Sequence, residues 1–282
     1  MRLRGHAAAV ALALSVALAA LPVHAAAAPL AATPEALAQA MRGHAVVLLG
    51  EVHDNGEQHA LRLAALQQLV ASGARPALAF EQFDREHQPA IEAARRERPR
   101  DAGFVIAQGK GAPSWKWEFY QPFVQLALDH DLPIVAANLS RAEAMKLALA
   151  APSSGSPELP AAFLRAHEQA IAKGHCDLLP AAALPGMASA QIARDRVLAE
   201  SIRPHARQGV VLLTGNGHAR RDVGVPFWLT PDERARTVSI GVLERDDDGS
   251  AADTASRFDA FVVTARAERP DPCEELRQRY RK

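Results

Sequence analysis

Several features that would assign a protein to a class are scarce in this sequence of 282 residues. Its 32 basic and 32 acidic residues balance, and no basic stripe with interleaved aromatic residues occurs. Because affinity for nucleic acid rests largely on positive charge, we expect no nucleic-acid partner. Cysteine is nearly absent, since Cys176 and Cys273 are the only two. They could pair in an oxidising compartment, and the sequence leaves that pairing open.

Long apolar segments are also missing, because beyond the N-terminal region no stretch approaches the roughly 20 apolar residues of a membrane span. The N-terminal region has Arg2 and Arg4, an apolar run over residues 7–21 and small residues around Ala25. This pattern predicts a signal peptide over residues 1–25, with an uncleaved anchor as the alternative. We expect an exported mature chain, periplasmic or associated with the cell envelope. No cysteine near the cleavage region is available for lipid attachment.

The familiar hydrolase signatures are absent: there is no Gly-x-Ser-x-Gly, no His-Glu-x-x-His and no phosphate loop. What the sequence has instead is a pair of matched strand ends. The apolar runs 46–49 and 210–213 each lead into a glycine-containing segment, which carries His53 in one case and His218 in the other. Such runs are typical of strands in a parallel sheet, where ligands collect at the carboxyl edge. The two histidines are therefore expected to share one site, unless both are ordinary loop residues.

Apolar runs and helical patterns alternate along the chain and predict an α/β fold, with a mainly parallel central sheet flanked by helices. A Ser/Gly/Pro-rich stretch over residues 152–160 interrupts this alternation and introduces two helices, which predict a helical lid or subdomain over about residues 160–206 of a single domain. Residues 99–114 are expected to form a loop. Strands are predicted at 46–49, 76–80, 133–137, 210–213, 237–243 and 260–264, and helices at 57–72, 88–98, 115–130, 161–173 and 187–206, with Ser140 as a helix cap.

Four of the strand-end residues could act as acid, base or metal ligands: Glu51, His53, Glu81 and His218. This set supports a hydrolase, with or without a divalent metal ion. A donor cluster over residues 175–177 has no partner at metal-ligand spacing, so metal binding there is not favoured.

One face of the second lid helix mixes polar and apolar residues at helical spacing: Met187, Gln191, Asp195 and Leu198. Such a face meets polar partners, lines a cavity or forms surface ion pairs.

The few aromatic residues, 5% of the chain, include a cluster of four within six positions: Trp115, Trp117, Phe119 and Tyr120. A cluster of this kind usually packs in a core or opens a helix, but a flat apolar cofactor also needs one. A tyrosine phenolate is a hard oxygen ligand that suits ferric iron.

The order of these segments resembles the ChaN-like haem-binding uptake family. That family belongs to a wider superfamily with the Tiki and TraB proteins and the erythromycin esterases, which share a Gly-Glu-x-His strand end. The segments that carry the resemblance are Leu49-Gly50-Glu51-Val52-His53-Asp54, Phe80-Glu81-Gln82-Phe83, Trp117 with Tyr120, Ala136-Ala137-Asn138-Leu139-Ser140-Arg141, His175-Cys176, Met187 with Gln191-x-x-Arg194-Asp195, and Gly215-Asn216-Gly217-His218-Ala219-Arg220.

The resemblance implies an α/β fold, two haems stacked face to face at a homodimer interface, and a role in iron acquisition with haem-uptake machinery as a partner. It makes Tyr120 the candidate iron ligand. The other residues expected to contact haem are His53, Trp117, Met187, Gln191 and His218. Two rivals stay open, namely a hydrolase of the same superfamily and a binding module for another apolar ligand.

Overall fold

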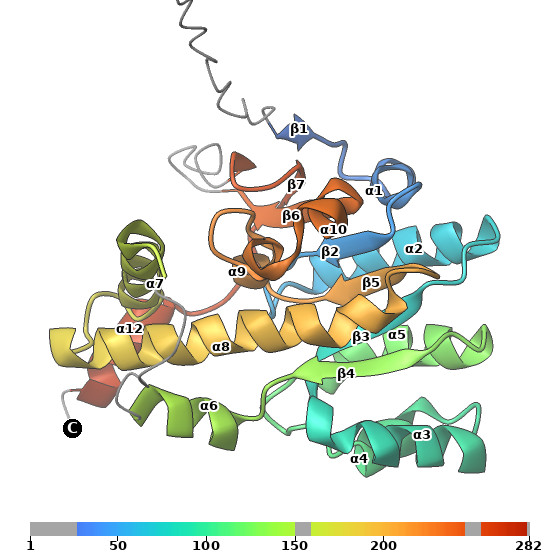
Figure 1. The fold of residues 1–282 in the computed structure, drawn as a ribbon, viewed down its shortest axis with the longest axis horizontal. Coiled ribbons are helices and arrows are strands. Elements are labelled where there is room, and N and C mark those ends of the chain that lie inside the picture. Colours follow the sequence, from blue (N-terminus) through green and yellow to red (C-terminus); the bar gives the residue numbers. More distant parts are fainter. Residues whose placement is uncertain (1–26, 150–158, 246–254, 281–282) are drawn as a thin grey trace, which may run out of the picture.

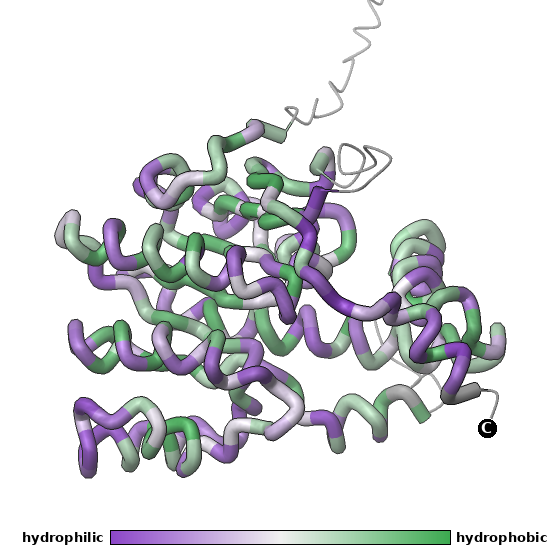
Figure 2. Tube along the Cα trace, turned by 180° about the vertical axis from the view of Figure 1, so that it is seen from behind, coloured by the Kyte–Doolittle hydropathy of each residue, from purple (hydrophilic) through white to green (hydrophobic). Residues whose placement is uncertain are grey.

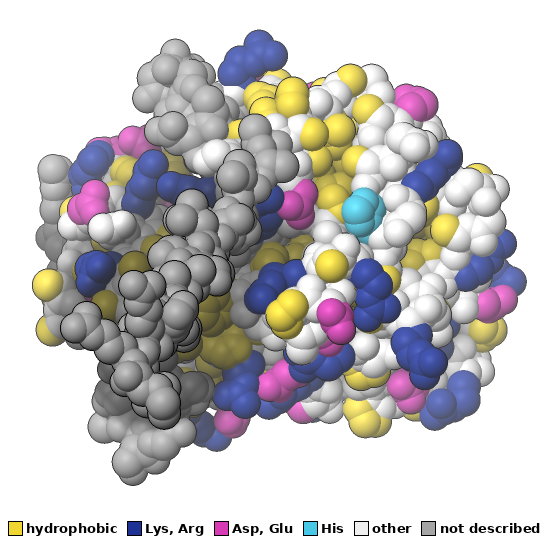
Figure 3. All heavy atoms as spheres, turned by 45° about the horizontal axis from the view of Figure 1, so that its top comes forward, with side chains coloured by type: hydrophobic (Ala, Val, Ile, Leu, Met, Phe, Trp, Pro, Cys, Tyr) yellow, Lys and Arg dark blue, Asp and Glu magenta, His cyan; other side chains and the backbone are white. Residues whose placement is uncertain are grey.

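The computed structural model describes residues 27–149, 159–245 and 255–280, so the predicted signal peptide lies outside the described residues. Within these ranges, no helix is both long and apolar enough to span a bilayer. On the face of the molecule seen in Figure 3, acidic and basic side chains are interspersed among hydrophobic ones.

A seven-stranded sheet forms the centre of the fold, and every strand pair in it is parallel. This confirms the predicted α/β class with a parallel sheet. The spatial order is β1-β7-β6-β2-β5-β3-β4 (Figure 1). The strands are β1 (Ala28–Pro29), β2 (Val46–Leu49), β3 (Ala77–Asp84), β4 (Ile134–Asn138), β5 (Val210–Leu213), β6 (Thr237–Glu244) and β7 (Ala260–Thr264).

Alternate residues of each central strand pack on opposite faces of the sheet. In β2, Val47 and Leu49 join one apolar core, whereas Val46 and Leu48 join the other. The first core is covered by α1 (Pro34–Met41), α2 (Gly56–Ala71), α3 (Gln88–Glu97), α4 (Ala102–Gln108) and α5 (Trp117–Asp129). The second is covered by α8 (Leu184–Ile202), α9 (Asn216–Ala219) and the 3₁₀ helix η4 (Val225–Trp228). Figure 2 shows hydrophobic strands inside and mixed helices outside.

The predicted helical lid is only partly separate from the sheet. The C-terminal half of α8 packs on the second core through Leu198, Ala199 and Ile202. Its N-terminal half extends past the sheet with α7 (Ala161–Gly174), while α6 (Arg141–Leu149) packs along α8 (Figure 1). The remaining elements are α10 (Pro231–Ala235), α12 (Pro272–Tyr280) and the 3₁₀ helices η1 (Arg85–His87), η2 (Ala181–Ala183) and η3 (Arg203–His205).

Some local expectations were wrong. Residues 99–114 are not all loop, because they contain α4. The Asp101 side chain accepts a hydrogen bond from Phe104 N at 2.8 Å and caps this helix, and Val105 and Ile106 bury its apolar face. Strand β3 continues to Asp84, so Glu81 lies within the strand rather than after it. The predicted cap at Ser140 is confirmed, since its hydroxyl accepts from Glu143 N at 3.3 Å.

The two cysteines form a disulfide, which settles the pairing that the sequence left open. It joins the turn after α7 to the first turn of α12, with the two Cα atoms 5.5 Å apart. The C-terminal segment is thereby attached to the helices beyond the sheet edge.

Candidate functional site

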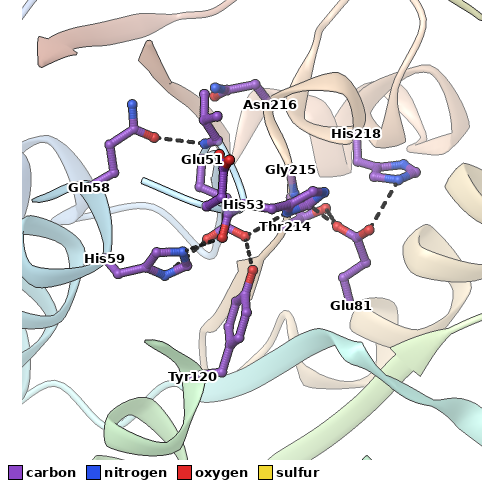
Figure 4. Close-up of polar contacts among 12 residues, drawn as sticks. Glu51, His53, Gln58, His59, Glu81, Tyr120, Thr214, Gly215, Asn216 and His218 are labelled. Carbon is purple, nitrogen blue, oxygen red and sulfur yellow. Dashed lines mark hydrogen bonds and ion pairs between the residues drawn. The ribbon is translucent and has the colours of Figure 1, made fainter. Parts of the chain in front are cut away.

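The site lies at the carboxyl ends of three adjacent strands, with β5 between β2 and β3. Glu51 and His53 follow β2, Glu81 lies within β3 just after its pairing with β5 ends, and His218 follows β5. The chain passes from β2 to β3 and returns later to fill the gap with β5, which is the kind of switch point where α/β folds bind ligands. The four side chains therefore lie at one edge of the sheet, as expected (Figure 4).

The segments that follow β2 and β5 can lie close together because residue 50 is a glycine. A Cβ atom at Gly50 would lie 2.3 Å from Oδ1 of Asn216. The Asn216 side-chain amide is hydrogen-bonded to β6: it accepts from Val242 N at 3.0 Å and donates to Val242 O at 2.6 Å. Any larger residue at position 50 would displace the Asn216 side chain and the segment that carries His218.

Glu51 is the centre of the first polar cluster, and its side chain is fully buried. Its Oε1 accepts from the Tyr120 hydroxyl at 2.5 Å and lies 2.9 Å from Nδ1 of His53. Its Oε2 pairs with the Arg62 guanidinium. The same oxygen lies 3.5 Å from Nδ1 of His59 (Figure 4). A buried carboxylate needs such compensation, because it has lost its hydration.

Helix α2 supplies two of these partners, His59 and Arg62, from positions three residues apart on one helix face. Arg62 has no exposed surface, donates to Leu49 O at 3.1 Å, and lies 5.5 Å from the centre of the Phe123 ring. Burial lowers the pKa of Arg62 to about 10, so it remains a cation at neutral pH. Burial also lowers the pKa of His59 to about 4, and its neutral ring donates from Nε2 to His53 O at 3.1 Å. Its Nδ1, which faces Glu51, then carries no proton, so the Arg62 cation and not His59 compensates the charge of Glu51.

His218 is the centre of the second cluster. Its Nδ1 lies 2.6 Å from Oδ1 of Asp195, and its Nε2 lies 3.5 Å from Oε1 of Glu81. The Gln191 carboxamide is 2.9 Å from the same Nε2. Oε2 of Glu81 accepts from the Thr214 hydroxyl at 2.6 Å and from Gly215 N at 2.9 Å. The polar face predicted on the second lid helix thus meets a polar partner.

Burial would lower the pKa of His218, but the two carboxylates oppose burial and raise it to about 10. Burial raises the pKa of Asp195 to about 6, while His218 acts in the opposite sense. Burial would also raise the pKa of Glu81, yet His218 holds that pKa below its usual range. At neutral pH His218 is therefore an imidazolium, and a carboxylate oxygen of Asp195 or Glu81 lies near each of its two ring nitrogens.

The C-terminal segment closes over the loop that carries His53. Arg269 pairs with both Asp54 and Glu244. The Asn55 amide donates to Glu244 Oε1 at 2.7 Å and to Ala265 O at 2.9 Å. These contacts and the disulfide link residues near the C-terminus to both sides of the site. Among the residues that the structure describes, no group of three or more His, Cys, Asp or Glu side chains is arranged to hold a metal ion.

Residues 37–229 match a family model described as haem-binding uptake, Tiki superfamily, ChaN. The chain belongs to this family. Among solved structures, the chain is similar to ChaN of Campylobacter jejuni, which binds haem cofacially, with 22% identity, a TM-score of 0.63, and coverage of 74% of this chain and 85% of that one. Identity at this level shows a shared fold.

Two other solved structures are similar to the chain at lower scores. A Bacillus cereus protein has 12% identity and a TM-score of 0.48 over 80% of this chain and 76% of that one. The erythromycin esterase EreC has 12% identity and a TM-score of 0.45 over 75% and 72%. A search of curated proteins found no match.

In this member of the haem-binding uptake family, the aromatic cluster divides between core and site. Trp117 packs on Phe83 with ring centres 5.0 Å apart, and its indole donates to Ala112 O at 3.0 Å. Trp115 instead stands edge-on to His53, with ring centres 4.9 Å apart. Tyr120, the predicted iron ligand, is only 1% exposed, so ligation by Tyr120 requires its hydroxyl to leave Glu51.

One more predicted residue lies beside the site, and two residues of the site were not predicted. Met187 lies half-buried in the first turn of α8, ahead of Gln191 on the same side. His59 and Arg62 were missed. The signal that could have found them is the spacing of Asn55, His59 and Arg62, which places three polar side chains on the face of α2 that meets the end of β2.

Proposed function

We propose that this chain is an exported haem-binding protein that acts in iron acquisition and holds haem at the carboxyl edge of the sheet. The family match over residues 37–229 carries this proposal. The geometry supports it, because the edge offers an accessible nitrogen donor, His53, beside an indole ring, Trp115. A bound haem would supply an iron atom that a protein side chain could ligate.

The side chains at this edge have the aromatic, apolar and polar groups that haem binding needs. Trp115 would supply an aromatic contact to the macrocycle, Met187 a flexible apolar contact and Gln191 a polar one. His218 would have a positioning role. Its contacts with Gln191 and Asp195 would hold α8 against the end of β5.

Exposed apolar side chains on α6 and α7 support a homodimer with two haems between the subunits. Met145, Leu147 and Leu149 of α6 are 49%, 42% and 80% exposed, and Leu164 of α7 is 37% exposed. Both helices pack against α8, the helix that carries Met187 and Gln191. Because exposed apolar area favours association, pairing of two loaded chains would cover these side chains together with the outer haem faces.

A haemin titration of the mature protein tests this proposal. We expect saturable binding with a shifted Soret band, and a shift from monomer to dimer in analytical ultracentrifugation as haemin is added. A wild-type protein that gives the spectrum of free haemin at all ratios would contradict haem binding. Binding without any change in mass would contradict only the dimer.

A hydrolase is the second candidate, and the hydrogen bond from His53 to Glu51 favours it. A carboxylate that orients a histidine is how many general bases are held. His218 does not serve as a base at neutral pH, because it is protonated there. Ester hydrolysis that is lost in His53→Ala, in the absence of haem, would support this candidate.

A further inference from the structure

We propose that the disulfide between Cys176 and Cys273 closes a redox-controlled strap across one end of the site, and that its reduction by a dithiol opens this end for ligand exchange. The strap is residues 265–273, which run from the end of β7 to the first turn of α12. The proposal rests on haem binding only for the identity of the ligand, because the strap would control exchange of any ligand at this edge of the sheet.

One end of the strap is anchored to the loop that follows β2 and carries His53. The Arg269 guanidinium pairs with both Asp54 and Glu244, and its side chain is 18% exposed. The Glu244 carboxylate also accepts a hydrogen bond from Ala267 N at 3.0 Å. None of these contacts involves sulfur, so this end of the strap stays in place whether the disulfide is oxidised or reduced.

The other end of the strap depends on the disulfide. Among residues 272–278 of α12, Cys273 and Leu276 are half-buried and the rest are exposed. The hydrogen bonds and ion pairs that these residues make with described residues stay within 271–278, as when Asp271 Oδ1 accepts from Cys273 N at 2.9 Å. A short helix without a buried face is not held by packing, so the disulfide is what attaches α12 to the fold.

The segment on the far side of the disulfide is also weakly held. Residues 168–187 run from the second half of α7 to the first turn of α8, and none of them is buried. The buried residues of α7, Phe163 and His167, both lie in its first half. Segments with so little burial open at a small cost in free energy. Because this segment ends at Met187, ahead of Gln191 on α8, its displacement would widen this end of the site.

The turn that holds Cys176 would be more stable with glycine at this position. Helix α7 ends in a Schellman motif, in which Cys176 N donates to Lys173 O at 3.0 Å and Asp177 N donates to Ala172 O at 2.9 Å. Cys176 has a left-handed backbone with a φ of 56°, and glycine is the usual residue at this point of the motif. Reduction removes the cross-link and leaves this unfavourable backbone, so the reduced turn gains by rearranging.

The switching step is thiol–disulfide exchange. Both cysteines are partly exposed, so a thiolate of the reductant can reach the bond. This thiolate attacks one Sγ and displaces the other cysteine as a thiolate, which takes up a proton. The second thiol of the reductant then displaces the first cysteine from the mixed disulfide. The reductant ends as a disulfide and the protein as two thiols, so two electrons pass from the dithiol to the protein.

Hydrogen–deuterium exchange, read by mass spectrometry, tests the strap without any ligand. The oxidised protein is compared with the protein reduced by dithiothreitol, at labelling times over which β2 stays protected in every sample. We expect exchange in residues 168–187 and 270–278 to be at least about tenfold faster after reduction. Residues 265–269 should keep their protection, because Arg269 still holds them.

The matched variant is Cys176→Gly with Cys273→Ser, which removes the cross-link, suits the left-handed turn and leaves no free thiol. It should exchange like the reduced protein, and dithiothreitol should not change it further. Haemin release to an acceptor apoprotein should be at least about fivefold faster from this variant than from the oxidised wild type.

Exchange in residues 168–187 that is equally slow in the oxidised and reduced proteins would overturn the strap. Faster exchange with unchanged haemin release would also overturn it, because the disulfide would then stabilise the fold without controlling the site. A wild-type protein that binds no haemin would remove the proposed function, and the exchange rates would then decide the strap by themselves.

Discussion

Replacing Arg62 by methionine should destabilise the protein far more than loss of an ordinary ion pair, because Arg62 and Glu51 are both fully buried. The substitution keeps most of the side-chain volume but leaves the Glu51 carboxylate without its cation. Breaking a buried pair from one side costs about 3–5 kcal/mol, since an uncompensated charge remains in the interior. The hydrogen bond to Leu49 O is lost as well.

Urea unfolding at pH 7, followed by circular dichroism, measures this cost. The control is Arg196→Met, whose partner Glu200 is on the surface, with the two side chains 59% and 42% exposed. That variant should lose less than about 1 kcal/mol. In the double variant Glu51→Gln with Arg62→Met the loss should be at least about 2 kcal/mol smaller than the sum of the single losses. Equal costs for Arg62→Met and Arg196→Met would refute the argument from burial.

Three further predictions concern pH, the disulfide and the N-terminus. The folded pKa of His218 is about 10 against an ordinary 6.5, so its stabilising contribution is complete below pH 6.5 and is lost as the pH rises through 10. Between pH 7 and 9 the free energy of unfolding should therefore fall about 1.4 kcal/mol per pH unit more steeply in the wild type than in His218→Gln, and parallel curves would disprove the assigned charge. Reducing the disulfide between Cys176 and Cys273, which are 97 positions apart, should lower the free energy of unfolding by about 2–5 kcal/mol, a result contradicted by an unchanged guanidinium midpoint. Mass spectrometry of the periplasmic fraction should find a chain that begins near residues 26–29, whereas a retained Met1 on the exported protein would exclude cleavage.

The strand order explains why residues far apart in the sequence could be assigned to one site. Apolar runs such as 46–49 and 210–213 are buried on both faces, and a parallel arrangement brings their carboxyl ends to one edge. Polar residues just after such runs, including His53 and His218, must then be neighbours. Local patterns located the edge without any knowledge of which strands pair.

Helix ends and short elements were less accessible, because they depend on contacts with distant residues. The segment that contains α4 is rich in glycine and reads as a loop, yet burial of Val105 and Ile106 against the first core stabilises a helix there. The disulfide between Cys176 and Cys273 depends on the C-terminal segment passing beside the site, which two isolated cysteines cannot indicate.

The sequence by itself determined the α/β class, the edge at which the site lies and the polar residues that gather there, because periodicity and strand-end position are local properties. Only the tertiary structure decided what each residue does. Two neighbouring carboxylates outweigh burial and keep His218 protonated at neutral pH, and Arg62 and Tyr120 fix Glu51. The same packing that removes Tyr120 from solvent leaves the His53 side chain half-exposed, since exposure and charge depend on neighbours that the chain brings together only on folding.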